Sequence, residues 1–118
     1  MKLKKIILLA CFIVGVIASN VSFAENVQVF IRHEVVDYKV WKKGYDAFTS
    51  EQRKGGVYFQ KVYQAIDNPN DVTVIHDFHS PEKAKAFMNN EKLIKYMKEI
   101  GVKSKPEIWY VRLDNASK

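Results

Sequence analysis

The sequence predicts an α+β fold in which strands and helical regions follow one another in the order βαββαβ. The first observation is an aromatic stripe: Tyr38, Trp41, Tyr45 and Phe48 recur at spacings of three, four and three residues, as on one helix face. The second is a set of four runs that alternate or are rich in β-branched residues, as strands are. The third is that turn formers and helix caps separate these segments. The stripe needs an apolar surface to cover, and four strands can supply it.

The first 24 residues have the features of an export signal and are left out of the predicted fold. Lysines at positions 2, 4 and 5 precede an apolar run over residues 6–18, and Ser22 and Ala24 supply the small residues of a cleavage site. We therefore expect cleavage after Ala24, a periplasmic or secreted protein, and no membrane attachment afterwards. The alternatives are an uncleaved anchor, although a span needs about 20 apolar residues, and a lipoprotein attached through Cys11.

Cysteine content, charge and length limit what the mature chain can do. Cys11 is the only cysteine in the sequence, so residues 25–118 contain no disulfide and no thiolate for catalysis or metal binding. Three signal lysines supply half of the formal net charge of +6, and the other basic residues are scattered among acids. We therefore expect no nucleic-acid partner. Residues 25–118 are one domain, close to the lower size limit for an independent core, and this predicts a homodimer.

The first half of the domain is predicted to be a strand, the aromatic helix and a second strand. Residues 27–35 alternate and form the first strand. Asp37 is placed to cap the helix, which is expected to run to about Arg53 and to end at Gly55-Gly56. Residues 57–66 form the second strand, and the turn formers at 67–71 join it to the next.

The second half repeats the pattern. A third strand at residues 72–78 leads to a second helical region. Ser80 caps this region, and Pro81 is its first residue. Asn89 and Asn90 bend or break this helix, which ends at Gly101. Residues 107–113 form the last strand. This order is that of the ferredoxin-like fold, an antiparallel sheet in the order 4-1-3-2 with both helices on one face.

Four stretches resemble the small dimeric α/β-barrel proteins grouped with antibiotic-biosynthesis monooxygenases, some of which are labelled "cyclase". They are the Asp-Tyr-x-x-Trp-Lys motif within residues 35–46, the hairpin sequence DNPNDVTV at 67–74, KAKAF at 83–87, and the GV…PEI pattern at 101–108. The resemblance implies that two sheets pack face to face in a dimer. It also implies a ligand pocket between each sheet and its own helices, without indicating a particular reaction.

Two histidines are expected to face that pocket. Strand alternation places His33 and His76 on the apolar sides of the first and third strands. Because these strands are antiparallel, we expect the two side chains at opposite ends of the sheet, on the order of 10 Å or more apart, and no metal site. His33 is the candidate catalytic residue, acting as a hydrogen-bond partner or proton carrier. The alternative is a buried histidine with a purely structural hydrogen bond.

The predicted ligand pocket combines aromatic rings with one histidine: Tyr38, Trp41, Tyr45, Phe59, Tyr63 and His76. Such rings suit a flat apolar molecule, and the alternative is that they only fill the core. Phe30, Arg32 and Glu34 point to the other side of the first strand and are the predicted dimer interface. No Gly-rich phosphate loop, Ser-His-Asp arrangement or HExxH motif is present, and we expect no cofactor.

Three functions are compatible with this sequence. The first is binding of a small apolar or aromatic molecule without chemistry. The second is cofactor-independent oxygenation or isomerisation of such a molecule, with His33 as the base. The third is a structural or assembly role for a homodimer whose pocket is filled by side chains.

Overall fold

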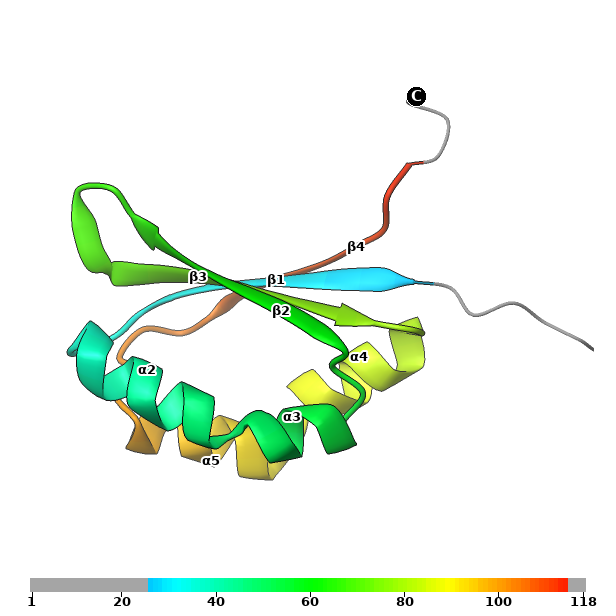
Figure 1. The fold of residues 1–118 in the computed structure, drawn as a ribbon, viewed down its shortest axis with the longest axis horizontal. Helices are drawn as coiled ribbons and strands as arrows, with labels where there is room; N and C mark the ends of the chain where they lie inside the picture. The colour runs from blue at the N-terminus through cyan, green and yellow to red at the C-terminus, as the bar shows by residue number, and fades with distance from the viewer. Residues whose placement is uncertain (1–25, 115–118) are drawn as a thin grey trace, which may run out of the picture.

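The computed structural model describes residues 26–114, which form a layer of strands on a layer of helices (Figure 1). The predicted signal peptide with Cys11, and residues 115–118, lie outside the described residues. The elements in chain order are β1 (Val27–Glu34), α2 (Tyr38–Ala47), α3 (Thr49–Lys54), β2 (Phe59–Ala65), β3 (Asn68–Phe78), α4 (Pro81–Met88), α5 (Glu91–Glu99) and β4 (Glu107–Val111).

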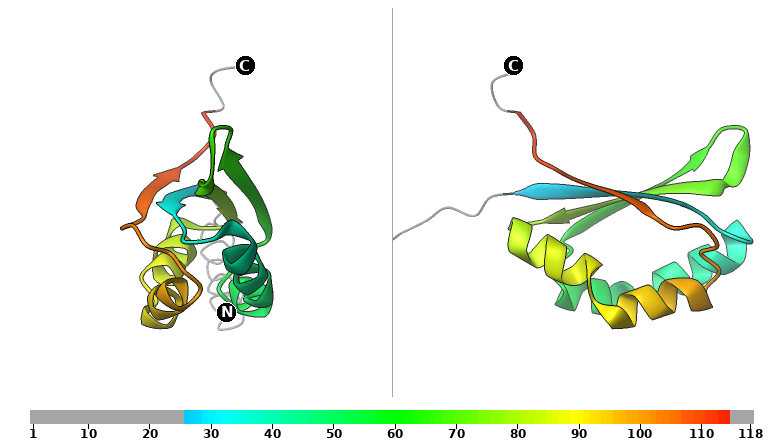
Figure 2. Two further views of the ribbon diagram at one scale, coloured as in Figure 1. Left: turned by 90° about the vertical axis from the view of Figure 1, so that its left-hand side faces the viewer. Right: turned by 180° about the vertical axis from the view of Figure 1, so that it is seen from behind.

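The sheet is antiparallel with the order β2-β3-β1-β4, which confirms the predicted ferredoxin-like topology. Figure 2 shows that α2 and α3 lie beside α4 and α5 on one face of the sheet, while the other face is uncovered. None of the helices within residues 26–114 is long and apolar enough to span a membrane. The described part of the chain thus has two layers and one open sheet face.

Strand register decides which residues face the helices. Val29 of β1 lies opposite His76 of β3, and His33 lies opposite Val72. Because side chains alternate along a strand, these positions share the inner face with the core. The largest fully buried side chains are Trp41, Phe78, Val29, Val35, Val72 and Val74.

The aromatic helix is broken, although a single helix to Arg53 was expected. It stops at Ala47, and Phe48 separates α2 from α3. The backbone N–H of Phe48 donates to the carbonyl of Tyr45 at 3.1 Å, and the Thr49 hydroxyl donates to the carbonyl of Asp46 at 2.6 Å. These bonds take up carbonyls that a helix end leaves unpaired, and so stabilise the break.

The predicted N-terminal caps of α2 and α4 are confirmed. The side chains of Asp37 and Ser80 accept hydrogen bonds from the N–H groups of Val40 and Lys83. Asn90 caps α5 by accepting from the N–H of Lys92 at 2.8 Å, which explains the break between α4 and α5. The left-handed residue after α3 is Gly56, with φ 103°, where a side chain would be strained.

The β2–β3 hairpin is tighter than expected. Residues 67–71 were predicted as a loop, but Ala65 pairs with Asn68, so β3 starts three positions before Asp71. The proline within this segment, Pro69, lies beyond Glu34↔Asp71, the last pair between β3 and β1. A missing N–H is tolerated there because no β1 residue needs it. The hairpin projects beyond the rest of the sheet in Figure 1.

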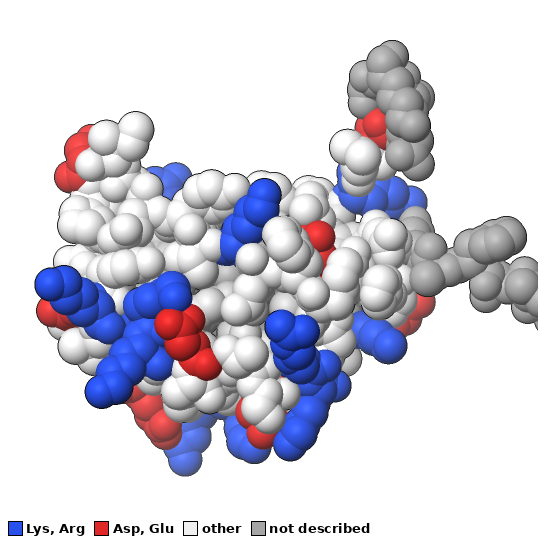
Figure 3. All heavy atoms as spheres, in the orientation of Figure 1, with Lys and Arg blue, Asp and Glu red and all other residues white. Residues whose placement is uncertain are grey.

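Charged side chains are mixed over the surface. On the side drawn in Figure 3, Lys and Arg residues lie among Asp and Glu residues over the helical layer. Ion pairs such as Lys42–Asp46 at 2.7 Å and Lys92–Glu51 at 3.8 Å connect neighbouring charges. This side therefore carries no continuous basic stripe.

Candidate functional site

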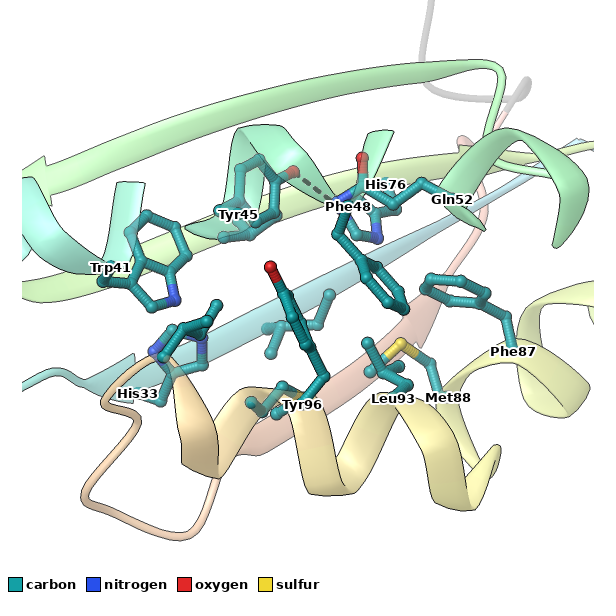
Figure 4. A pocket seen from close by; sticks show the side chains of 14 residues that line it. His33, Trp41, Tyr45, Phe48, Gln52, His76, Phe87, Met88, Leu93 and Tyr96 are labelled. Carbon is teal, nitrogen blue, oxygen red and sulfur yellow. Dashed lines mark hydrogen bonds between the residues drawn. The ribbon is translucent and has the colours of Figure 1, made fainter. Parts of the chain in front are cut away.

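A small cavity lies between the inner face of the sheet and both helix pairs (Figure 4). It has a volume of about 40 Å³. Its lining combines apolar and aromatic side chains with three polar residues: Ile31, His33, Trp41, Tyr45, Phe48, Gln52, Val74, His76, Phe87, Met88, Leu93, Tyr96, Met97 and Ile100. The space under the helices is therefore not packed solid.

Trp41 forms the wall of the cavity on the α2 side. Only 1% of its surface is exposed, and its ring stacks on Tyr45 with centroids 4.9 Å apart. It also contacts His33, edge to face at 5.6 Å. Tyr38 packs on Trp41 at 5.8 Å but does not line the cavity, so its assignment to the pocket was wrong.

His76 and Tyr45 form a buried polar pair at one end of the cavity. The Tyr45 hydroxyl and the Nε2 atom of His76 are 2.8 Å apart, as the dashed line in Figure 4 shows. Burial lowers the pKa of His76 to about 4, and burial, followed by the charge of Asp46, raises the pKa of Tyr45. Both groups are therefore neutral at physiological pH.

The hydrogen-bonding capacity of this pair is not used up. When Tyr45 donates to Nε2 of His76, the imidazole carries its proton on Nδ1 and can donate from there. When Nε2 donates to Tyr45, Nδ1 is a free acceptor. Nδ1 of His76 is thus available to a third group in either tautomer.

Nδ1 of His76 is one of three buried polar atoms that have no hydrogen-bond partner within the described residues. Among the described residues, the buried side-chain nitrogens and oxygens without a hydrogen-bond partner in the protein are Nδ1 of His33, Nδ1 of His76 and Oε1 of Gln52. All three residues line the same cavity. Such atoms are uncommon in folded proteins and cost free energy unless water or a ligand pairs with them.

His33 lies at the other end of the cavity from His76. Burial lowers its pKa, while a hydrogen bond to the backbone and then the Asp71 carboxylate raise it by smaller amounts. Since Val29 pairs with His76, the two histidines are four residues apart along the sheet, or about 13 Å at ~3.3 Å per residue. This confirms the expected separation.

The distance between His33 and His76 is too large for both to bind one metal ion. Histidine nitrogens bind zinc at about 2.0–2.1 Å, so two of them on one ion must lie within a few ångströms of each other. Within residues 26–114, no group of three or more His, Cys, Asp or Glu side chains is arranged to hold a metal ion. The cavity can instead accept or donate hydrogen bonds at both of its ends.

Two residues of β2 that were predicted to line the pocket lie outside the cavity. Phe59 and Tyr63 pair with Asp77 and Thr73 on the uncovered face of the sheet, and each is 48% exposed. It is Gln60, opposite His76, that shares the inner face. The expectation failed because both sides of β2 mix polar and apolar residues, which leaves the phase of the alternation undefined.

Among the lining residues that the sequence did not assign to the pocket, Gln52 and Tyr96 carry hydrogen-bonding groups. Gln52 follows Phe48 by four positions and so extends the aromatic stripe by one turn across the helix break. Tyr96 lies three positions after Leu93 on the apolar face of α5. Helical periodicity alone could have identified both residues.

Tyr96 and Phe48 connect the two helix pairs across the cavity. Their rings stack with centroids 4.6 Å apart, and the Tyr96 hydroxyl donates to the carbonyl of Gly44 at 2.8 Å. A Cβ atom on Gly44 would lie 2.5 Å from Cγ2 of Ile100, so the glycine permits this close approach. We call Phe48, Tyr96 and the Gly44 carbonyl the aromatic latch.

The predicted interface residues lie on the uncovered face of β1. Arg32 makes two hydrogen bonds to the Asp71 carboxylate, at 3.0 and 2.7 Å, and Glu34 lies 3.5 Å from Lys103. Both charged residues thus have partners within their own chain. Phe30 is half-buried and pairs with Trp109, which is 48% exposed.

Sequence comparison finds no relative, whereas structural comparison does. No protein-family model matches the sequence, and no curated protein matches it. A protein of Bordetella bronchiseptica, provisionally named an antibiotic biosynthesis monooxygenase, aligns with a TM-score of 0.66 at 11% identity, over 76% of this chain and 98% of its own. The chain therefore shares its ferredoxin-like fold with this protein.

Two further solved structures share this fold. SnoaB of Streptomyces nogalater, a cofactor-independent oxygenase, aligns with a TM-score of 0.61 at 10% identity, over 78% of this chain and 98% of SnoaB. A conserved protein of Methanosarcina mazei Go1 reaches a TM-score of 0.61 at 18% identity, over 77% of this chain and 95% of its own. Identities this low show a shared fold, so function must be argued from the cavity.

Proposed function

We propose that this protein binds a small apolar or aromatic molecule, carrying a hydrogen-bonding group, between its sheet and its helices. The observation that supports this most strongly is the clustering of unpartnered buried polar atoms, from His33, Gln52 and His76, in one cavity. A molecule with an apolar body and a hydroxyl or carbonyl group would satisfy one or more of these atoms while its body contacts the aromatic walls.

The size of the cavity sets a condition on binding. Its volume of about 40 Å³ is well below the ~150 Å³ of a cavity that accepts benzene. Binding therefore requires some lining side chains to move. Met88 and Met97 are suited to this because a methionine side chain is unbranched and has three rotatable bonds.

The pKa values favour binding over acid–base chemistry. An efficient general base has a pKa near the working pH, and the pKa of His76 is lowered to about 4. The second candidate, cofactor-independent oxygenation or isomerisation, would depend on His33 and is supported by the fold shared with SnoaB. Incubating the protein with phenols and quinols under oxygen tests this candidate. Recovery of the compounds unchanged would argue against catalysis, and turnover by His33→Ala would show that His33 is not the catalytic base.

Calorimetric titration with 2-naphthol, phenol and naphthalene tests the binding proposal. We expect saturable binding of at least one of these probes by the wild type and its loss in Ile31→Phe, because the added ring occupies the cavity. The matched control is Ile66→Phe, at a fully exposed turn residue. Circular dichroism establishes that each variant is folded. Binding that is equal in all three proteins, or absent from the wild type, would contradict the proposal.

We also propose that the protein acts outside the cytoplasm as a homodimer. The basic start, apolar run and Ser-Phe-Ala site of the first 24 residues support export, with lipidation at Cys11 as the alternative. The uncovered, partly apolar sheet face supports a second copy as partner. The mass of the protein from a periplasmic fraction tests export: retention of residues 1–24 would contradict cleavage.

A further inference from the structure

A second depression lies next to the cavity, between α5, β4 and the segment that joins them. Figure 2 shows these elements side by side from behind. We call this depression the outer groove. Its volume is about 540 Å³, and its lining is Met88, Asn89, Ile94, Met97, Lys98, Val102, Lys103, Ser104, Lys105, Pro106 and Ile108. This volume falls within the ~300–1,000 Å³ of small-molecule sites, in contrast to the inner cavity.

The lining of the outer groove combines apolar side chains with positive charge. Ile94 and Ile108 belong to it and are 43% and 37% exposed. Three lysines, Lys98, Lys103 and Lys105, supply the charges. An apolar surface with positive charges beside it is complementary to a molecule with an apolar chain and an anionic end.

These positive charges are poorly compensated within the chain. No Asp or Glu from the described range lines the outer groove. Lys103 lies 3.5 Å from Glu34, but Lys98 and Lys105 form no ion pair with a carboxylate of residues 26–114. An incoming anion would therefore meet two free ammonium groups.

Another basic depression shows the contrast. Lys54, Lys83 and Lys92 line the space between α3 and the α4–α5 pair, together with Glu51. This carboxylate lies 3.7 Å from Lys54 and 3.8 Å from Lys92. Its cations are thus already partly neutralised, and the outer groove is the better anion site of the two.

Two methionines separate the outer groove from the inner cavity. Met88 and Met97 line both spaces. Rotation of their flexible side chains would join the groove to the cavity. The additional volume that ligand binding requires is therefore available on this side.

We propose that the outer groove is a second binding site, for an anionic amphiphile of the class of medium-chain carboxylates. Its carboxylate lies between Lys98 and Lys105, and its chain covers the apolar lining of the groove and ends against Met88 and Met97. This inference goes beyond the proposed cavity ligand, whose hydrogen-bonding group pairs with His33, Gln52 or His76.

Binding of decanoate, measured by calorimetry below its micelle concentration, tests the charge requirement. Replacing both free lysines in Lys98→Gln/Lys105→Gln weakens binding about tenfold, as expected for two exposed ion pairs. The matched control, Lys43→Gln/Lys95→Gln, removes two lysines that line none of these depressions and changes the affinity less than twofold. Binding of neutral 1-decanol is the same in all variants, and raised salt weakens only decanoate binding.

The ¹³C-methyl signals of Met88 and Met97 test the location. Both methyl signals shift saturably on addition of decanoate, relative to an added reference compound. Decanoate binding that is insensitive to the lysine pair, with unshifted methionines, would overturn the inference while 2-naphthol binding in the cavity still upheld the proposed function. Failure of both probes would remove both proposals. Methionine shifts that follow protein concentration alone would assign the outer groove to a second copy and overturn the inference.

Discussion

At the scale of single residues, the buried imidazole of His76 carries the most information about the cavity. Its Nε2 atom is paired with the Tyr45 hydroxyl, while its Nδ1 atom faces the cavity without a partner in the protein. Burial holds its pKa at about 4, so it stays neutral across the physiological range. A neutral imidazole with one free nitrogen is suited to recognising a polar group on a bound molecule.

This burial predicts a pH dependence of stability. An unfolded histidine has a pKa near 6.5, so the unfolded chain binds more protons than the folded one between about pH 6.5 and pH 4. The free energy of unfolding therefore falls by up to about 3 kcal/mol as the pH drops through this window. His33, whose pKa is also lowered by burial, acts in the same direction.

Urea unfolding at several pH values measures this effect. His76→Gln, which retains a group able to bond to Tyr45, loses the part of the pH dependence that belongs to His76. The control Ile66→Gln changes a fully exposed side chain that does not titrate, and it keeps the pH dependence of the wild type. Identical pH profiles for wild type and His76→Gln would show that His76 is not buried as the structure has it.

Residue positions could be predicted wherever the alternation had one clear phase. His33 and His76 lie within two strands rich in valine and isoleucine, and the structure places both on the inner face as expected. β2 has no such phase, and Phe59 and Tyr63 were therefore assigned to the wrong side. In that strand, tertiary packing decides the face, and it depends on partners that lie far away in the sequence.

At the scale of elements, the break at Phe48 links α2 to α5. A helix end leaves its last four carbonyls without helical partners, and in α2 these begin at Gly44. The Tyr96 hydroxyl supplies the missing donor for the Gly44 carbonyl. The caps at Asp37 and Ser80 could be predicted because they are local, whereas this link depends on a residue 52 positions away.

Removing the latch hydrogen bond should weaken the helical layer. We expect Tyr96→Phe to lower the free energy of unfolding by about 1 kcal/mol, because the ring stack on Phe48 remains while the Gly44 carbonyl loses its partner. Thermal unfolding measures the difference. Tyr58→Phe, which alters a 40% exposed tyrosine, is the control. Equal stability of both variants would mean that the hydrogen bond contributes nothing.

At the scale of the whole molecule, one sheet face has helices on it and the other has none. Trp109, Phe59 and Tyr63 are each 48% exposed on the uncovered face, where β1 also presents the half-buried Phe30. The order of the strands could be predicted from the order of the elements. What covers the open face could not, because it depends on a surface outside this chain.

Sedimentation analysis tests the homodimer. We expect the wild type to have the mass of two chains and Trp109→Asp to have that of one, because the charge would be buried against the facing sheet. The control Val40→Asp lies on an exposed position of α2, away from the sheet, and leaves the mass unchanged. A wild type that sediments as a lone, stable chain would contradict the homodimer.

The cavity account is tested most directly by ¹⁵N NMR of the three imidazole rings in the chain. On addition of 2-naphthol, we predict saturable shifts of the ring nitrogens of His33 and His76, whose Nδ1 atoms gain a partner. The ring of His79, which contacts Asn26 on the surface, remains unchanged and serves as the internal reference. Signals of His33 and His76 that do not move, or that move in step with His79, would contradict a ligand site in this cavity.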